Sequence, residues 1–101
     1  MHKDANSQID HEEQDQEQVL IRDLKRLGPD SIEVADDMAR LAQLNLHHGK
    51  LMVAEHLYKR SLDIRIRLLG PAHPDIAQST RGLAAVYDVE RKAMASAAKS
   101  A

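Results

Sequence analysis

An internal repeat is the feature that most constrains what this chain can fold into. Leu27-Gly28-Pro29 recurs as Leu69-Gly70-Pro71, so the two copies are offset by 42 positions, from 28 to 70. Residues of similar type also match at this offset on both sides of the tripeptide. The matched pairs are Leu20 and Leu62, Leu24 and Ile66, Val34 and Ile76, Ala35 and Ala77, Leu41 and Leu83, Ala42 and Ala84, Leu44 and Val86, and Lys50 and Lys92. The period predicts a tandem helical repeat, in which each unit covers an apolar face of its neighbour.

Apolar residues recur at helical spacing, and the runs are separated by three sets of helix stop signals. Gly28-Pro29, His48-Gly49-Lys50 and Gly70-Pro71 are typical of helix ends, because glycine adopts a left-handed conformation easily and proline cannot continue a helix. We therefore expect helices over residues 10–27, 31–47, 51–69 and from 74 onward. Asp30 or Ser31 is the expected cap of the second helix, and Pro74 suits the first position of the fourth.

The first helix is expected to begin at Asp10. Asp10-His11-Glu12-Glu13 has the spacing of a capping box, in which the Asp10 carboxylate accepts from a free backbone N–H and Glu13 reaches back. Residues 1–9 are polar and are predicted to form a flexible N-terminal arm. Residues 10–92 form the predicted helical repeat domain, and residues 93–101 an Ala-rich C-terminal tail.

Composition agrees with one small all-α domain. Of the 101 residues, 43% are hydrophobic but only 2% are aromatic, with no Phe and no Trp, so the core must be built from aliphatic residues and alanine. Such a core suits helices packed closely through small residues. Cysteine is absent, which excludes disulfides and thiolate metal sites. No apolar run approaches the ~18 residues of a membrane span, and the N-terminus lacks the apolar core of a signal peptide. We expect a cytoplasmic protein that does not bind membranes.

The charge distribution argues against nucleic acid as a partner. Residues 1–18 carry six acidic residues and one lysine, and the other 83 residues carry 13 basic and 10 acidic residues. This mild basic excess is far from the dense positive stripe that phosphate binding requires. The acidic stretch is interpreted as a solvated segment.

The stretch 41–77 resembles a tetratricopeptide repeat (TPR), in the long form of 42 residues found in kinesin light chains. The residues that carry the resemblance are Leu41-Ala42, Gly49-Lys50, Ala54, Leu57-Tyr58, Arg60-Ser61-Leu62, Ile64, Leu69-Gly70 and His73-Pro74-Asp75-Ile76-Ala77. The resemblance implies the antiparallel helical hairpins of an α-solenoid. Its four helices would follow the order B-A-B-A, which is one full repeat flanked by two halves.

The resemblance also implies a non-enzymatic adaptor that binds another protein or a peptide on the concave face formed by the A helices. The implied partner-binding residues are Asp36, Ala39, Gln43, Leu46, His47, Gln78, Arg81, Ala85, Asp88 and Val89. Arg81 could pair with an acidic group of the partner. Where repeats of the kinesin-light-chain type usually carry an Asn-Asn pair, this chain has Ala39-Arg40 and Arg81-Gly82.

Self-assembly is the alternative function, because the two half repeats are expected to leave apolar faces uncovered. In this hypothesis protomers complete each other's repeats and form a homo-oligomer. Leu20 and Leu24 of one chain would cover Val86 and Tyr87 of the next, with Leu83 beside them.

No residue pattern indicates catalysis, a cofactor or a metal. Ser61 and Ser79 have no base at a recognisable spacing, and there is no glycine-rich phosphate loop. His47 or His48 could approach His56 across the turn, but no carboxylate or cysteine completes a site at motif spacing. We therefore expect no enzymatic activity, no cofactor and no bound metal.

Overall fold

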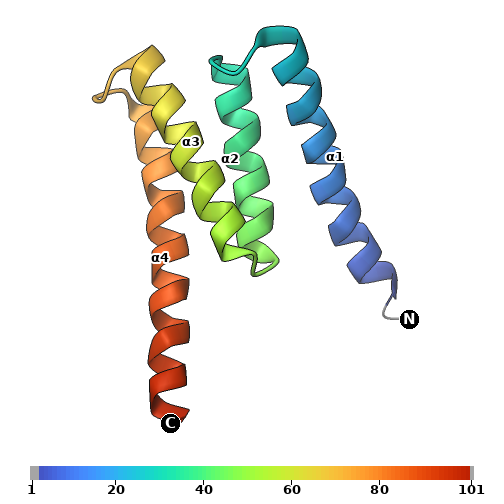
Figure 1. Cartoon of the computed structure of the whole chain (residues 1–101), viewed down its shortest axis with the longest axis vertical. Helices are drawn as coiled ribbons and strands as arrows, with labels where there is room; N and C mark the ends of the chain where they lie inside the picture. The colour runs from blue at the N-terminus through green and yellow to red at the C-terminus, as the bar shows by residue number, and fades with distance from the viewer. Residues whose placement is uncertain (1–2, 101) are drawn as a thin grey trace.

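The computed structural model describes the backbone of residues 3–100 and the side chains of residues 11–98. It contains four helices, α1 (Lys3–Leu27), α2 (Ile32–His47), α3 (Leu51–Leu69) and α4 (Pro74–Ser100), and no strand occurs within residues 3–100. Figure 1 shows α3 lying between α2 and α4, with α1 on the other side of α2. The predicted all-α class and the order of four helices are confirmed.

Most helix boundaries lie where the stop and start signals predict them. Ser31 caps α2, and its hydroxyl accepts a hydrogen bond of 3.1 Å from the backbone N–H of Val34. The glycines that follow α1 and α3, Gly28 and Gly70, have φ values of +83° and +87°. Only glycine adopts this conformation without strain, so these two residues end their helices and let the chain reverse.

Helix α1 begins at Lys3, so the predicted start at Asp10 is wrong. No glycine or proline interrupts residues 3–9, and extending an existing helix is far easier than starting one. Asp10 therefore lies inside α1 rather than at its cap, and Glu13 makes other contacts, described below. Residues 1, 2 and 101 lie outside the described part of the chain, and the division into arm, domain and tail stays a prediction.

Helix α4 continues through the Ala-rich stretch to Ser100. Its second half extends past the ends of the neighbouring helices (Figure 1), and the side chains of residues 91–98 are all exposed. Alanine is the strongest helix former, so this part of α4 is helical without burying a face. None of the helices in residues 3–100 is long and apolar enough to span a lipid bilayer.

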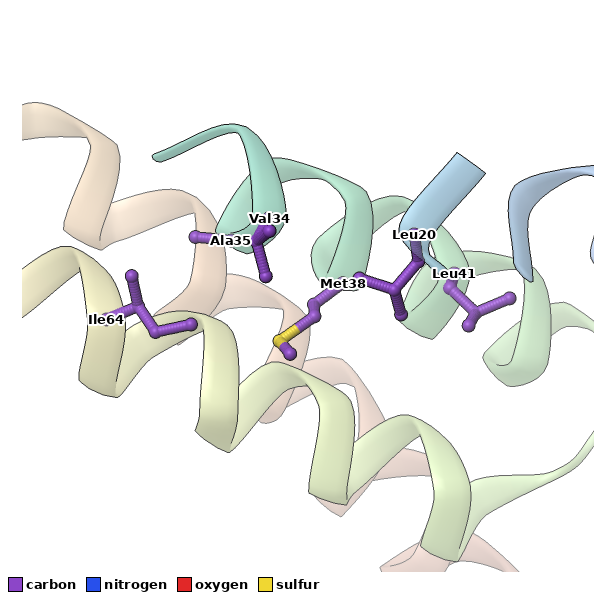
Figure 2. Packing of buried hydrophobic residues seen from close by; sticks show 6 residues of the cluster. All are labelled: Leu20, Val34, Ala35, Met38, Leu41 and Ile64. Atoms are coloured by element: carbon purple, nitrogen blue, oxygen red, sulfur yellow. The ribbon is translucent and has the colours of Figure 1, made fainter. Parts of the chain in front are cut away.

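The core consists of two adjoining clusters that share helices α2 and α3. The first joins α1, α2 and α3, and its buried members are Leu20, Val34, Ala35, Met38, Leu41 and Ile64. In Figure 2 Met38 extends from α2 toward α3, while Leu20 reaches α2 from α1. The second cluster joins α2, α3 and α4 through Ala39, Ala42, Ala54, Tyr58, Leu83 and Val86. The small side chains of the second cluster let α2, α3 and α4 approach closely.

Candidate binding groove

A groove of about 580 Å³ runs between α2 and α4, with part of α3 at its floor. Its walls come from two helices that occupy the same position in successive repeats, because 42 residues separate equivalent points of α2 and α4. The residues that line it are Asp36, Ala39, Arg40, Gln43, Leu46, His47, Tyr58, Arg65, Asp75, Gln78, Arg81, Gly82 and Ala85. The groove thus lies on the face that the resemblance assigns to a partner.

Eight of the ten predicted partner-binding residues line this groove. They are Asp36, Ala39, Gln43, Leu46, His47, Gln78, Arg81 and Ala85. The other two, Asp88 and Val89, are not among its lining residues. Asp88 forms ion pairs of 2.9 Å with Arg91 and 3.1 Å with Lys92, which lie further along α4. Binding of a partner by the eight residues stays a prediction.

The floor of the groove is closed by Tyr58 against Gly82. Tyr58 of α3 is buried, and a Cβ placed on Gly82 of α4 would lie only 2.3 Å from the Cε1 atom of its ring. Any side chain at position 82 would therefore push the ring away, so the glycine sets how closely α4 approaches α3. The repeat period does not predict this contact, because a glycine inside a helix gives no local sign of what packs against it.

A buried arginine, Arg65 of α3, supports one end of the groove. Only 2% of Arg65 is exposed, and its Nη2 atom lies 2.6 Å from Oδ1 of Asp36 on α2. Its Nη1 atom donates to the hydroxyl of Ser79 on α4 at 2.8 Å and to the backbone oxygen of Asp75 at 3.4 Å. The Ser61 hydroxyl completes the cluster by donating to a backbone oxygen of α2. One arginine therefore ties together α2, α3 and α4.

This cluster determines which charges the groove offers to a ligand. Because Asp36 neutralises Arg65, the floor carries no free charge at this end. On the walls, Arg81 and Arg40 are both exposed. Arg81 donates only to the backbone oxygen of Ala77 within the described residues, and Arg40 lies 3.6 Å from Asp37. The walls therefore present two arginines to an incoming group, one from each helix, together with the exposed carboxylate of Asp75 on α4.

Five lining residues were not predicted: Arg40, Tyr58, Arg65, Asp75 and Gly82. Tyr58 and Arg65 belong to α3, whereas the resemblance implies a surface formed by the A helices alone. The signal that could have found Arg65 is its position, since it follows Ile64 on the apolar stripe of α3, where a charged residue needs a partner.

The residues predicted for self-association are mostly used inside the chain. Leu20, Leu83 and Val86 are buried in the two core clusters, and Leu24 packs against the first of them. Of the set only Tyr87 is largely exposed, at 43%. Contact between Leu20 and Val86 of neighbouring chains would require both core clusters to open, so assembly in that form does not fit the fold.

Glu13 joins α1 to the turn between α2 and α3. Its carboxylate accepts a hydrogen bond of 2.8 Å from Nζ of Lys50 and lies 2.6 Å from Nδ1 of His48. The Lys50 ammonium group is the main reason that the pKa of Glu13 lies below its usual value, and His48 adds to the effect. Among the described residues, no three His, Asp or Glu side chains are grouped so as to hold a metal ion.

The comparisons with known proteins agree with this geometry. A family model described as tetratricopeptide repeat matches residues 37–99, which contain most of α2 and all of α3. Neither the curated proteins nor the solved structures give a match.

Proposed function

We propose, because the chain belongs to the tetratricopeptide repeat family, that it is a non-enzymatic adaptor whose groove between α2 and α4 holds an extended segment of a partner protein. Repeats of this family are typically protein interaction modules. The observation that carries the proposal is the groove itself, which is about 580 Å³ in volume and is lined by eight of the residues that the family resemblance implies for partner binding. The kinesin-light-chain resemblance suggests no specific cargo, because both Asn-Asn positions are occupied by other residues.

The chemistry of the groove favours a partner segment with an acidic side chain between short apolar ones. Arg40 and Arg81 can each offer a guanidinium group to a carboxylate. Ala39, Ala85 and Leu46 also line the groove and offer apolar contacts. An exposed ion pair of this kind contributes only about 0.2–1 kcal/mol, so the apolar contacts and the backbone must supply most of the affinity.

A random peptide library displayed on phage and selected on the immobilised protein tests this proposal. We expect the selected peptides to lose affinity about threefold to tenfold in Arg81→Ala and Gln43→Ala, because both side chains line the groove. Arg60→Ala is the matched control, since Arg60 is an exposed arginine of α3 that does not line the groove. Equal losses in Arg81→Ala and Arg60→Ala, or none in the groove variants, would refute the proposal.

Assembly of identical chains is a second candidate, in a form different from the predicted one. On α2, Val34, Ala35 and Met38 are buried, whereas the equivalent Ile76, Ala77 and Thr80 of α4 are half-buried or exposed. A second copy could cover this outer face of α4. Light scattering across a concentration series should then show a dimer that Thr80→Glu converts to a monomer. A wild-type monomer at several hundred micromolar would rule this candidate out.

A further inference from the structure

A second hollow, which we call the α1 hollow, lies between α1 and α2 and has a volume of about 430 Å³. Figure 1 shows α1 and α4 on opposite sides of α2, so the α1 hollow and the groove flank the same helix. Arg40 and Gln43 line both of them, and both side chains are exposed. An extended segment that lies in the groove can therefore cross α2 at these two residues and enter the α1 hollow.

The wall that α1 contributes is a single stripe along the helix. Its residues follow the spacing i, i+3, i+4 and i+7, which places them on one helix face, and they are Glu12, Asp15, Gln16 and Val19. Glu12 and Asp15 are exposed, whereas Val19 and the facing Leu44 of α2 are half-buried. The α1 hollow thus combines two exposed carboxylates with an apolar surface.

The two carboxylates of this wall are not used inside the chain. Within residues 11–98 neither Glu12 nor Asp15 forms an ion pair or a hydrogen bond. Arg40 is the basic residue of the facing wall, but its Nη1 atom lies 3.6 Å from Oδ1 of Asp37. Glu12 and Asp15 are therefore available to a positively charged group from outside the chain.

Comparison of the repeats shows that the α1 hollow is not a place left for another apolar helix. The equivalent stripe of α3, 42 residues later, packs in the second core cluster through Ala54, Leu57 and Tyr58. On α1 the three equivalent positions carry polar side chains, and two of these are acidic. An apolar helix of a second copy would bury both carboxylates without a partner, which is costly. The chemistry of the α1 hollow therefore fits a cation.

The cation that fits is an amino-acid side chain and not a metal ion. Among the described residues, no three His, Asp or Glu side chains are grouped so as to hold a metal, and hard cations such as Ca²⁺ take six or more oxygen ligands. Lysine and arginine carry their charge on a long apolar stem. That stem can lie on Val19 and Leu44 while the charged end meets the carboxylates of Glu12 and Asp15.

We propose that the α1 hollow binds a lysine or arginine side chain of the partner segment that occupies the groove. This inference rests on the proposed function and adds that the segment is dipolar, with a basic residue over α1 and an acidic residue near Arg81 of α4. Charges of opposite sign at its two ends fix the direction in which the segment lies. A reversed segment would place like charges together at both α1 and α4.

Parallel selections from the phage-displayed peptide library test the inference on the whole chain. Peptides selected on the wild type should be enriched in lysine or arginine at one position, and the enrichment should disappear on the double variant Glu12→Gln/Asp15→Asn. Glu17→Gln is the matched control and should select like the wild type, because Glu17 is an exposed acid of α1 that does not line the α1 hollow. No basic enrichment on the wild type, or equal enrichment on the double variant, would overturn the inference.

The strength of the contact is measured with one selected peptide and an analogue whose basic residue is replaced by norleucine, which keeps an apolar stem without the charge. The analogue should bind the wild type about twofold to tenfold more weakly, and the loss should shrink in high salt. On the double variant the two peptides should bind equally, because the charged partners are absent. An analogue that binds the wild type as well as its parent would refute the inference.

Arg81→Ala distinguishes failure of this inference from failure of the proposed function. Peptides that lose affinity in Arg81→Ala but bind the wild type and the double variant equally would overturn the inference and leave the groove as the binding site. Loss of affinity in the double variant alone would support the α1 hollow and refute the groove. A dimer in light scattering that the double variant converts to a monomer would assign the α1 hollow to a second copy and overturn the inference.

Discussion

Replacing Gly82 by alanine tests whether the contact with Tyr58 sets the spacing of α3 and α4. In an exposed part of a helix this change would stabilise the fold by about 1 kcal/mol, because alanine has the higher helix propensity. At position 82 the new Cβ would lie 2.3, 2.4 and 2.7 Å from three atoms of the Tyr58 ring. Ordinary contact distances are near 3.5 Å, so the ring or the helix must move by about 1 Å.

Overpacking of this size costs about 1–3 kcal/mol, and Tyr58 is buried in a cluster of small residues that has little room to adjust. Because the cluster has little room to adjust, the cost should lie in the upper part of this range, at about 2–3 kcal/mol. Subtracting the gain in propensity of about 1 kcal/mol, we expect Gly82→Ala to be about 1–2 kcal/mol less stable than the wild type. For a domain of this length the melting temperature should fall by roughly 4–8 °C for each kcal/mol. The displaced ring would also protrude into the floor of the groove and weaken peptide binding.

Urea denaturation gives the difference in the free energy of unfolding between Gly82→Ala and the wild type. The comparison holds if this free energy falls with urea concentration at the same slope in both proteins. Ala84→Gly, at an exposed position of the same helix, is the matched control and measures the propensity alone. In a Tyr58→Ala background the sign should reverse, and Gly82→Ala should stabilise the chain. A Gly82→Ala protein that is as stable as the wild type in the presence of Tyr58 would refute the reasoning.

Four other substitutions have expected outcomes that denaturation can check. Arg65→Ala should lower stability by about 3–5 kcal/mol, because it removes a buried charge that joins three helices, and Asp36→Asn should lower it as well by leaving that charge without its carboxylate. Glu13→Gln should destabilise the chain by about 1–2 kcal/mol near pH 7. Since the pKa of Glu13 is lowered by Lys50, its contribution is present above the unfolded value of 4.5 and disappears as the pH falls through the folded value, so wild type and variant should converge in acid. Ser31→Ala should cost about 1 kcal/mol through loss of the cap of α2.

The helices could be predicted from local signals and the period, and the lining of the groove from the resemblance to tetratricopeptide repeats. Glycine and proline at 28–29 and 70–71 mark helix ends by local backbone chemistry, which needs no knowledge of the rest of the chain. An offset of 42 residues places α2 and α4 in equivalent positions, and the resemblance implies that such A helices line one concave face. This argument identified eight of the lining residues correctly as neighbours in space.

The groups that depend on contacts between helices could not be predicted in this way. Asp23 and Asp37 each look like ordinary exposed acids of a helix, but in the structure both are buried. Gly82 has meaning only beside the ring of Tyr58. Val86 was predicted to be uncovered because α4 is the first half of an incomplete repeat. In the structure α3 packs on α4 as well as on α2, and Val86 is buried there. Periodicity predicts which face is apolar, but not which partner covers it.

The exposed second half of α4 affects how unfolding of this chain can be observed. Residues 91–98 are helical but bury no side chain, so their helical state depends on backbone hydrogen bonds and alanine propensity and not on the core. On heating they should fray gradually, whereas the core around Tyr58 melts cooperatively. Far-ultraviolet circular dichroism would then begin to decline before the near-ultraviolet signal of the buried tyrosine changes. If the melting curves from these two signals fail to coincide, the difference would in this protein indicate a fraying helix end and not a populated folding intermediate.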